Sequence, residues 1–338
     1  MNFSKLCVLS VIILLISCEQ NQTKSFSLSG ITSNIPDSTL VYFHNLFNGE
    51  TIDSAIVLDN KFQFETKFEK YPNWVMMHAL NRQEFTELWI ENNPMNFDAS
   101  DSDFSEGKIY GSNSQKVENV YNEIDWLSKQ PEESNRLKFK FIKDHPNSII
   151  AAKVIAFNAD RWGREKSKIL YDGLAPEMKN SIFKDRIERV INSKQPILGA
   201  KYVDFILKDS SRVNQQFSKL TGELTLLQFW ASGCGYSRMD NLYLEKAYEL
   251  FSKKGFKIVG ISIDSDKSKW KNAIINDSLS FVNLSSLKGK NGEVKQAYGI
   301  FSTPNNFLFD SNGVLIARGI KGENLVEELE NYFSNKNS

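Results

Sequence analysis

The feature that most constrains this chain is a buried strand that ends just before a cysteine and a helix. The run Leu224–Trp230 is almost entirely apolar, which is typical of a strand buried on both faces. Cys234 follows it, and apolar residues then recur at helical spacing: Leu242, Leu244, Ala247, Tyr248 and Phe251. The first-turn N–H groups and the dipole of a helix favour an anion. Because the thiolate is the nucleophilic form of cysteine, this placement predicts a reactive thiol with a lowered pKa.

The N-terminus has the pattern of a targeting segment. Lys5 precedes an apolar run over residues 6–16, which is too short to span a bilayer and suits a signal peptide. The run ends in Leu15-Ile16-Ser17-Cys18, which resembles a bacterial lipobox. That resemblance implies cleavage before Cys18 and lipidation of Cys18, whereas the alternative is an ordinary signal peptide with an incidental cysteine. We therefore expect a lipoprotein signal peptide over residues 1–17 and a tether over residues 18–24.

The cysteine count follows from this interpretation. Cys7 would leave with the signal peptide and Cys18 would carry lipid, so Cys234 would be the one thiol of the mature chain. The charge balance argues against a nucleic-acid partner. The chain has 41 Lys and Arg residues and 41 Asp and Glu residues, so it carries no net positive charge that would attract nucleic acid. We expect no nucleic-acid partner, no metal and no other cofactor.

Three patterns follow the expected tether. Residues 25–111 alternate or cluster strand-forming residues between turn signals, which predicts a β-sandwich domain. Residues 112–195 change to helical periodicity and are interpreted as a helical spacer. Residues 196–338 alternate strands and helices before a closing hairpin and helix, which predicts an α/β sheet of mixed direction. The fold class is thus multidomain.

A few conspicuous residues are better explained by packing than by chemistry. Aromatic residues on alternating strands usually lie inside a sandwich, so we assign four residues to its core: Trp74, Trp89, His44 and His78. His145 stands before a proline without neighbouring ligand residues and is interpreted as a turn residue.

Several features of residues 196–338 agree with one family. Phe229-Trp230-Ala231-Ser232 leads into Cys234, Asp264 follows a second apolar strand, and Thr303-Pro304 precedes the apolar run 307–309. Together they resemble the TlpA/ResA-like branch of the thioredoxin superfamily, which overlaps the AhpC/TSA type. The sandwich resembles a domain of unknown function that commonly precedes thioredoxin-like domains in bacterial lipoproteins.

The resemblance implies a thioredoxin fold in which a cis Pro304 lies beside Cys234. Backbone groups exposed there could bind the extended chain of a partner by strand addition. The expected substrate-binding residues are Trp230, Tyr236, Thr303 and Pro304. The expected catalytic residues are Cys234, Ser237, Arg238 and Asp240. Of these, Arg238 lies one turn below Cys234 and would add a positive charge, and Asp240 occupies the position of a glutamate that assists proton transfer in related proteins.

The active-site motif departs from the family pattern. The family has two cysteines separated by two residues, whereas this chain reads Cys234-Gly235-Tyr236-Ser237. A serine hydroxyl cannot release a client from a mixed disulfide as a second thiolate does. Ser237 is instead expected to hydrogen-bond the Cys234 thiolate. Peroxiredoxins carry a threonine that orients peroxide, and its position is Ala231 here.

Three functions therefore stay open. The first is a monothiol thiol-disulfide oxidoreductase, which would exchange with protein thiols or disulfides and be recycled by an external thiol reductant. The second is a redox-degenerate thioredoxin fold that binds a partner through the Thr303-Pro304 groove, and the third is a one-cysteine peroxidase. For each we expect a lipid-anchored protein of the cell envelope, in the outer membrane and facing the periplasm.

Overall fold

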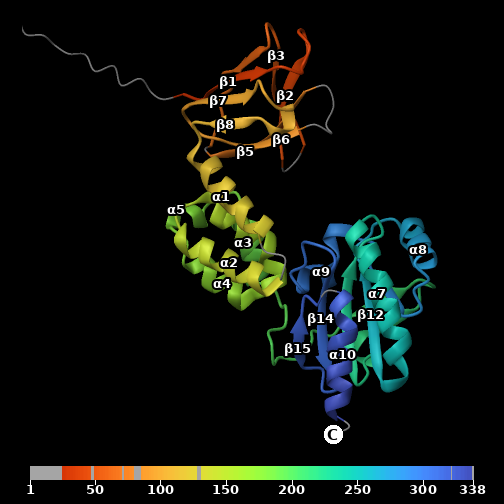
Figure 1. Cartoon of the computed structure of the whole chain (residues 1–338). Coiled ribbons are helices and arrows are strands. Elements are labelled where there is room, and N and C mark those ends of the chain that lie inside the picture. The colour runs from red at the N-terminus through yellow and green to blue at the C-terminus, as the bar shows by residue number, and fades with distance from the viewer. Residues whose placement is uncertain are drawn as a thin grey trace, which may run out of the picture. The chain divides into compact units, whose positions relative to one another are not determined.

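A computed structural model describes residues 25–46, 49–70, 72–79, 85–127, 131–320 and 322–336 of the chain. The expected signal peptide, the tether and Cys18 lie outside these residues. The chain divides into two compact units, Met1–Lys116 and Val117–Ser338 (Figure 1). The second unit groups most of the expected helical spacer with the α/β fold, so the division of the chain into a separate spacer stays a prediction. In the part of the chain that is described, no helix has both the length and the apolar character needed to cross a bilayer.

The first unit is a two-sheet β structure, as the alternation predicts. One sheet has the order β4-β1-β7-β8 and the other β3-β2-β5-β6. Strands β1 and β7 pair in parallel, whereas the other pairs are antiparallel. The strands are β1 Ser27–Thr32, β2 Leu40–Asn45, β3 Thr51–Ile56, β4 Lys61–Phe64, β5 Asn73–Ala79, β6 Phe85–Ile90, β7 Pro94–Ala99 and β8 Lys108–Tyr110, with a short 3-10 turn at Phe104–Glu106.

The four aromatic and histidine residues singled out in this unit are buried, as expected, but none belongs to the apolar core that joins its two sheets. Trp74 and His78 alternate along β5 with Val75 and Met77, which do belong to that core, so they face the opposite side of the sheet. The rings of Trp74 and Trp89 stack with their centroids 5.5 Å apart, and both are buried. The Nε2 atoms of His44 and His78 lie 2.8 Å apart in a buried hydrogen bond. Each of these polar atoms is thereby satisfied inside the sheet, which is what burial of an imidazole requires.

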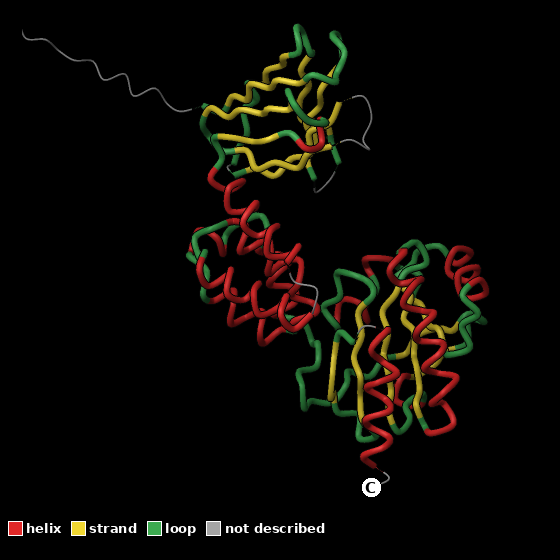
Figure 2. The backbone as a smooth tube through the Cα atoms, viewed as in Figure 1, coloured by secondary structure: helices red, strands yellow, loops and turns green. Residues whose placement is uncertain are grey.

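Within the expected helical segment, residues 112–195, the described residues form six helices. Helices are drawn in red in Figure 2. They are α1 Asn113–Leu127, α2 Pro131–Asp144, α3 Ile149–Trp162, α4 Arg164–Asp172, α5 Pro176–Lys179 and α6 Lys184–Ile191. Ser148 caps α3, its hydroxyl accepting from the N–H of Ile150, and α3 is buried along much of its length. His145 is a turn residue, as expected: its Nδ1 lies 3.0 Å from the carbonyl oxygen of Phe141.

The last part of the chain is a seven-stranded mixed sheet with the order β10-β9-β13-β12-β11-β14-β15. Its central strand β11 pairs in parallel with β12 and antiparallel with β14, and all seven of its residues are buried. The strands are β9 Ile206–Asp209, β10 Asn214–Gln216, β11 Leu224–Trp230, β12 Phe256–Ser262, β13 Val282–Ser285, β14 Asn305–Asp310 and β15 Leu315–Arg318. The helices are α7 Gly235–Phe251, α8 Lys267–Asn276, α9 Glu293–Ala297 and α10 Gly322–Lys336.

Helices cover both faces of this sheet. One apolar core joins the sheet to α7, α8 and α10, and a second joins the other face to α9 (Figure 1). The residues before the opening hairpin of β9 and β10 are not part of it, because β9 begins at Ile206. The N–H of Tyr202 instead donates to the carbonyl of Gly313, and that of Leu315 to Ala200, so this segment pairs with the β14–β15 turn.

Candidate active site

Cys234 lies at the junction that the sequence predicts. It is the N-cap residue of α7, with extended backbone angles (φ −94°, ψ 110°), and its carbonyl accepts from the N–H of Arg238 at 3.0 Å. Its Sγ lies 3.4 Å from the carbonyl oxygen of Thr303. The Thr303-Pro304 peptide bond is cis, as the resemblance implies. Cys234 is only partly buried.

Several contacts set the pKa of the Cys234 thiol. Partial burial raises it, but the nearby Ser237 hydroxyl, the Ser237 N–H, the Thr303 side chain and the Tyr236 N–H lower it, and the net pKa is below the ordinary value. Ser237 is completely buried, and its hydroxyl oxygen makes no hydrogen bond of ordinary geometry among the described residues. The Ser237 hydroxyl is therefore available to the sulfur.

The turn before Cys234 is held by the end of β12. Asp264 accepts from the N–H of Ser232 at 3.1 Å and from its hydroxyl at 2.8 Å. The hydroxyl of Ser262 donates to the same carboxylate at 2.7 Å. Parallel pairing of β11 and β12 brings Asp264 beside this turn, so the carboxylate fixes the entry to α7.

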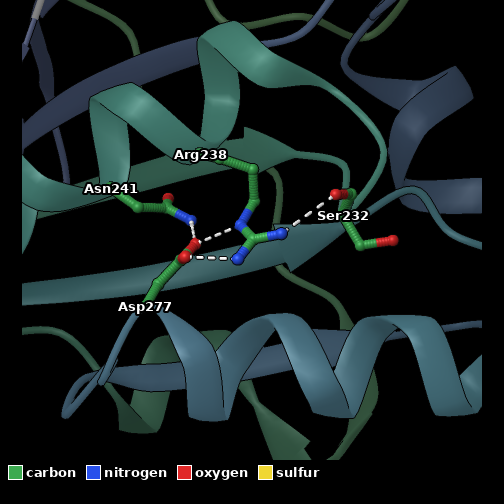
Figure 3. A network of polar contacts seen from close by, with 4 residues as sticks. All are labelled: Ser232, Arg238, Asn241 and Asp277. Carbon is green, nitrogen blue, oxygen red and sulfur yellow. Dashed lines mark hydrogen bonds and ion pairs between the residues drawn. The ribbon is translucent and has the colours of Figure 1, made fainter.

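Arg238 has a different partner from the one we expected. Its guanidinium forms a two-pronged ion pair with Asp277, with Nε to Oδ2 and Nη2 to Oδ1 both at 2.5 Å (Figure 3). Asn241 donates to the same carboxylate at 2.8 Å, and Arg238 Nη1 donates to the carbonyl of Ser232 at 3.4 Å. Asp277 balances the charge of Arg238, and the main contacts that lower the pKa of Cys234 come from other residues. Arg238 thus ties α7 to the end of α8 and to the turn before Cys234.

Asp240 forms hydrogen bonds with two other parts of the fold. Its Oδ2 accepts from Nε2 of Gln228 in β11 at 2.9 Å, and its Oδ1 accepts from the N–H of Gly322 at 2.7 Å. These contacts connect α7 with the central strand and with the start of α10. The expected part of Asp240 in proton transfer stays a prediction.

The four expected substrate-binding residues divide into two groups. Tyr236 is 73% exposed, and Thr303 and Pro304 are half-buried, so these three can contact a client. Trp230 is 0% exposed, and its indole N–H donates to Oδ1 of Asn283 at 3.0 Å. The assignment of Trp230 to the binding surface was wrong, because the strand that carries it is buried on both faces.

Three residues that matter at this site received no role from the sequence. Asp264 was noted only as a family feature, and Asp277 and Asn283 were not singled out. Each acts through a partner far away in the sequence, Ser232, Arg238 or Trp230 respectively. For Asp264 and Asp277 the available sequence signal was an acidic residue just after an apolar strand or a helix, and for Asn283 there was none.

The geometry defines a class of protein. A mixed sheet carries a partly exposed cysteine at the start of a helix, and a cis-proline at the entrance to the neighbouring strand lies beside the sulfur. This is a thioredoxin-fold domain with a thiol site.

Comparisons with known proteins agree with this class. The model of the Redoxin family matches residues 197–333, and that of a domain of unknown function (DUF4369) matches residues 26–118. The thiol-disulfide oxidoreductase ResA of Oceanobacillus iheyensis is 32% identical over 135 residues, which are 39% of this chain and 68% of that protein. ResA of Bacillus subtilis is 25% identical over 136 residues, covering 39% and 74%.

Similar folds occur among solved structures. A thiol-disulfide oxidoreductase from Bacteroides fragilis is 30% identical, with 39% of this chain and 99% of that one covered and a TM-score of 0.37. The thioredoxin domain of a thiol-disulfide oxidoreductase from Bacteroides vulgatus is 28% identical, with 40% and 97% covered and a TM-score of 0.38. The chain belongs to the family of thioredoxin-fold thiol-disulfide oxidoreductases that includes ResA.

Proposed function

We propose that the protein is a membrane-anchored thiol-disulfide oxidoreductase that acts through one nucleophilic cysteine, Cys234. The observation that carries the proposal is the environment of its sulfur. The sulfur lies partly exposed at the start of α7, with a lowered pKa and Ser237 in the place of a second thiol. A thiol with a lowered pKa and without a resolving cysteine suits exchange with mixed disulfides.

The chemistry consists of two exchanges. The Cys234 thiolate attacks the small-thiol sulfur of a mixed disulfide between a client and a small thiol; a new S–S bond joins Cys234 to the small thiol, the old S–S bond breaks, and the client sulfur leaves as thiolate. A second small thiolate then attacks the Cys234 disulfide, regenerates the Cys234 thiolate and carries the oxidised sulfur away as a low-molecular-weight disulfide. Each turnover consumes one molecule of the small thiol, which is the external reductant: its sulfur is oxidised into the new disulfide while the client sulfur is reduced to a thiolate.

The geometry supports the remaining catalytic and binding roles in this proposal. Ser237 stabilises the thiolate through its hydroxyl, and Arg238 and Asp240 support α7, on which that hydroxyl lies. Tyr236, Thr303 and Pro304 form the surface on which the client chain docks. Backbone groups at the start of β14 can accept an extended peptide by strand addition.

The proposal extends to the N-terminus and the location of the protein. Residues 1–17 are a lipoprotein signal peptide, Cys18 carries the lipid and residues 18–24 are a tether. The β-sandwich spans 25–111, the helical spacer 112–195 and the thioredoxin-like domain 196–338. The anchored protein faces the periplasm from the outer membrane. Incorporation of labelled fatty acid into the expressed chain, lost in Cys18→Ala, tests the anchor.

Reduction of a glutathionylated protein by the full chain with added glutathione tests the activity. We expect turnover with the wild-type chain and none with Cys234→Ser, while Ser268→Ala, an exposed change on α8, leaves turnover unchanged. Absence of turnover, together with an ordinary Cys234 pKa, would favour the partner-binding module. Rapid sulfenic-acid formation with dilute peroxide would favour the one-cysteine peroxidase.

A further inference from the structure

The segment that carries Thr303 is held by a side chain from outside the thioredoxin fold. Asp160 lies near the end of α3, 141 residues before Phe301 in the sequence. Its Oδ2 accepts three hydrogen bonds: from the N–H of Phe301 at 2.9 Å, from the N–H of Ser302 at 2.8 Å and from the hydroxyl of Ser302 at 2.9 Å. One carboxylate oxygen therefore binds both residues that precede Thr303.

Asp160 is a buried charge with cationic neighbours. Its side chain is 1% exposed, and its Oδ1 has no hydrogen-bond partner among the described residues. Burial lowers the pKa of Arg318 to about 10, and the charge of Asp160 opposes this change. Burial also lowers the pKa of Arg186, and Asp160 opposes that shift as well. Burial of a carboxylate is costly unless hydrogen bonds and opposite charges compensate it, and here the bonds from Phe301 and Ser302 and the nearby guanidinium groups do so.

Other contacts hold the same segment against the helices. Nε2 of Gln195 donates to the carbonyls of Asp160 and Tyr298, at 3.1 and 3.0 Å. The Phe301 ring has the guanidinium groups of Arg186 and Arg189 at 4.8 and 5.2 Å from its centroid. The chain from Tyr298 to Ser302 is thus fastened to α3 and α6, and the following residue contacts the sulfur of Cys234.

We infer that Asp160 is a positioning residue of the thiol site, which makes the helical segment a working part of the oxidoreductase and not a spacer alone. By fixing the N–H groups of Phe301 and Ser302, it sets where Thr303 and Pro304 stand relative to Cys234. Without these bonds the segment can move, so Thr303 would contact the sulfur and a docked client less often. The inference rests on the proposed thiol chemistry of Cys234.

The test compares Asp160→Ala with Asp160→Asn in the full chain. The measurements are the rate of Cys234 alkylation against pH, and KM and kcat for a glutathionylated protein. In Asp160→Ala we expect the midpoint of the alkylation rate to move to higher pH, so that the rate at neutral pH falls about threefold or more. We also expect KM for the glutathionylated protein to rise. Asp160→Asn should recover most of both values, because its amide oxygen can accept from the same two N–H groups.

A control separates positioning from general stability. Tyr171→Phe removes hydrogen bonds to Lys179 and Glu188 within the helical segment, so it should lower stability without moving the alkylation midpoint. If Asp160→Ala does not fold, Ser302→Ala replaces it, with a smaller shift in the same direction. A folded Asp160→Ala, or Ser302→Ala in its place, with the wild-type pH profile and KM overturns the inference. A wild-type chain with an ordinary thiol pKa would instead overturn the proposed function.

Discussion

The sulfur of Cys234 lies 3.4 Å from the carbonyl oxygen of Thr303, although 69 residues separate the two along the chain. Antiparallel pairing of β11 with β14 produces this proximity, because it brings the end of one strand beside the start of the other. The thiol therefore faces the backbone segment on which a client would dock. Attack on a docked disulfide and recognition of its chain would take place at one point of the surface.

Ser237→Ala should make Cys234 less reactive at neutral pH. The Ser237 hydroxyl is the largest of the contacts that lower the thiol pKa, so its loss moves the pKa upward and reduces the thiolate fraction at any pH below it. The alkylation rate measured against pH should show a midpoint at higher pH, with Ser268→Ala as the control. An unchanged midpoint would mean that the hydroxyl does not reach the sulfur.

Ser237→Cys should convert the site to a dithiol. Residue 237 lies within the first turn of α7, beside Cys234, so a thiol there can attack a mixed disulfide on Cys234 and release the client. We expect reduction of insulin by the variant in the presence of dithiothreitol, well above the wild-type rate. Thiol titration after mild oxidation should show loss of both thiols. A variant that keeps two titratable thiols after oxidation and does not reduce insulin would contradict this.

Asp277→Ala should destabilise the second unit by about 2 kcal/mol. The change removes a two-pronged ion pair and leaves the partly buried Arg238 guanidinium and the Asn241 amide without their shared acceptor. Urea denaturation of the wild type and the variant gives the difference. In an Arg238→Ala background the same change should cost much less, and equal costs in the two backgrounds would show that the pair is not coupled.

Gly30→Ala should destabilise the β-sandwich by about 1–3 kcal/mol. A Cβ at Gly30 would lie 2.1 Å from Cζ of Phe62, a buried ring on the neighbouring strand β4. The thermal midpoint of the first unit should fall, whereas Ser29→Ala, an exposed change on the same strand, should leave it nearly unchanged. Equal midpoints for the two variants would show that the Phe62 ring moves aside without cost.

Tyr236→Ala should weaken client binding and leave stability within about 0.5 kcal/mol of the wild type. The ring is 73% exposed next to Cys234, so it has little to contribute to folding. We expect KM for a glutathionylated protein to rise while the reaction with a small disulfide is unaffected. Tyr243→Ala, further along α7 and 41% exposed, is the control. Similar KM values for both variants would remove Tyr236 from the docking surface.

Residues that act along one stretch of chain were predictable. The spacing of apolar residues predicted the strand β11 and the helix α7. The position of Cys234 between them in the sequence then placed its thiol at the start of the helix. The motif around Thr303-Pro304 also predicted the cis bond that the structure contains. The pattern of short strands predicted the sandwich and the burial of Trp74 and Trp89, but it did not predict that both lie outside the core between the sheets. In each case a local pattern of apolar and turn residues carries the information.

Residues that act through a partner far away in the sequence could not be assigned their roles from the sequence. Its place in the sequence gives Arg238 a positive charge near the thiol, but in the structure Asp277 pairs with that charge. The motif assigns Trp230 to client binding, but in the structure its side chain is completely buried. Asp160 gave no signal at all.

The amino-acid sequence by itself determined the order of the elements, the family and the Cys234 thiol with a serine in place of a resolving cysteine. Only the tertiary structure decided what surrounds that thiol, because strand pairing and helix packing join Cys234, Thr303 and Asp160 from remote parts of the chain. A hydrogen bond depends on distance in space, and position along the chain does not supply that distance.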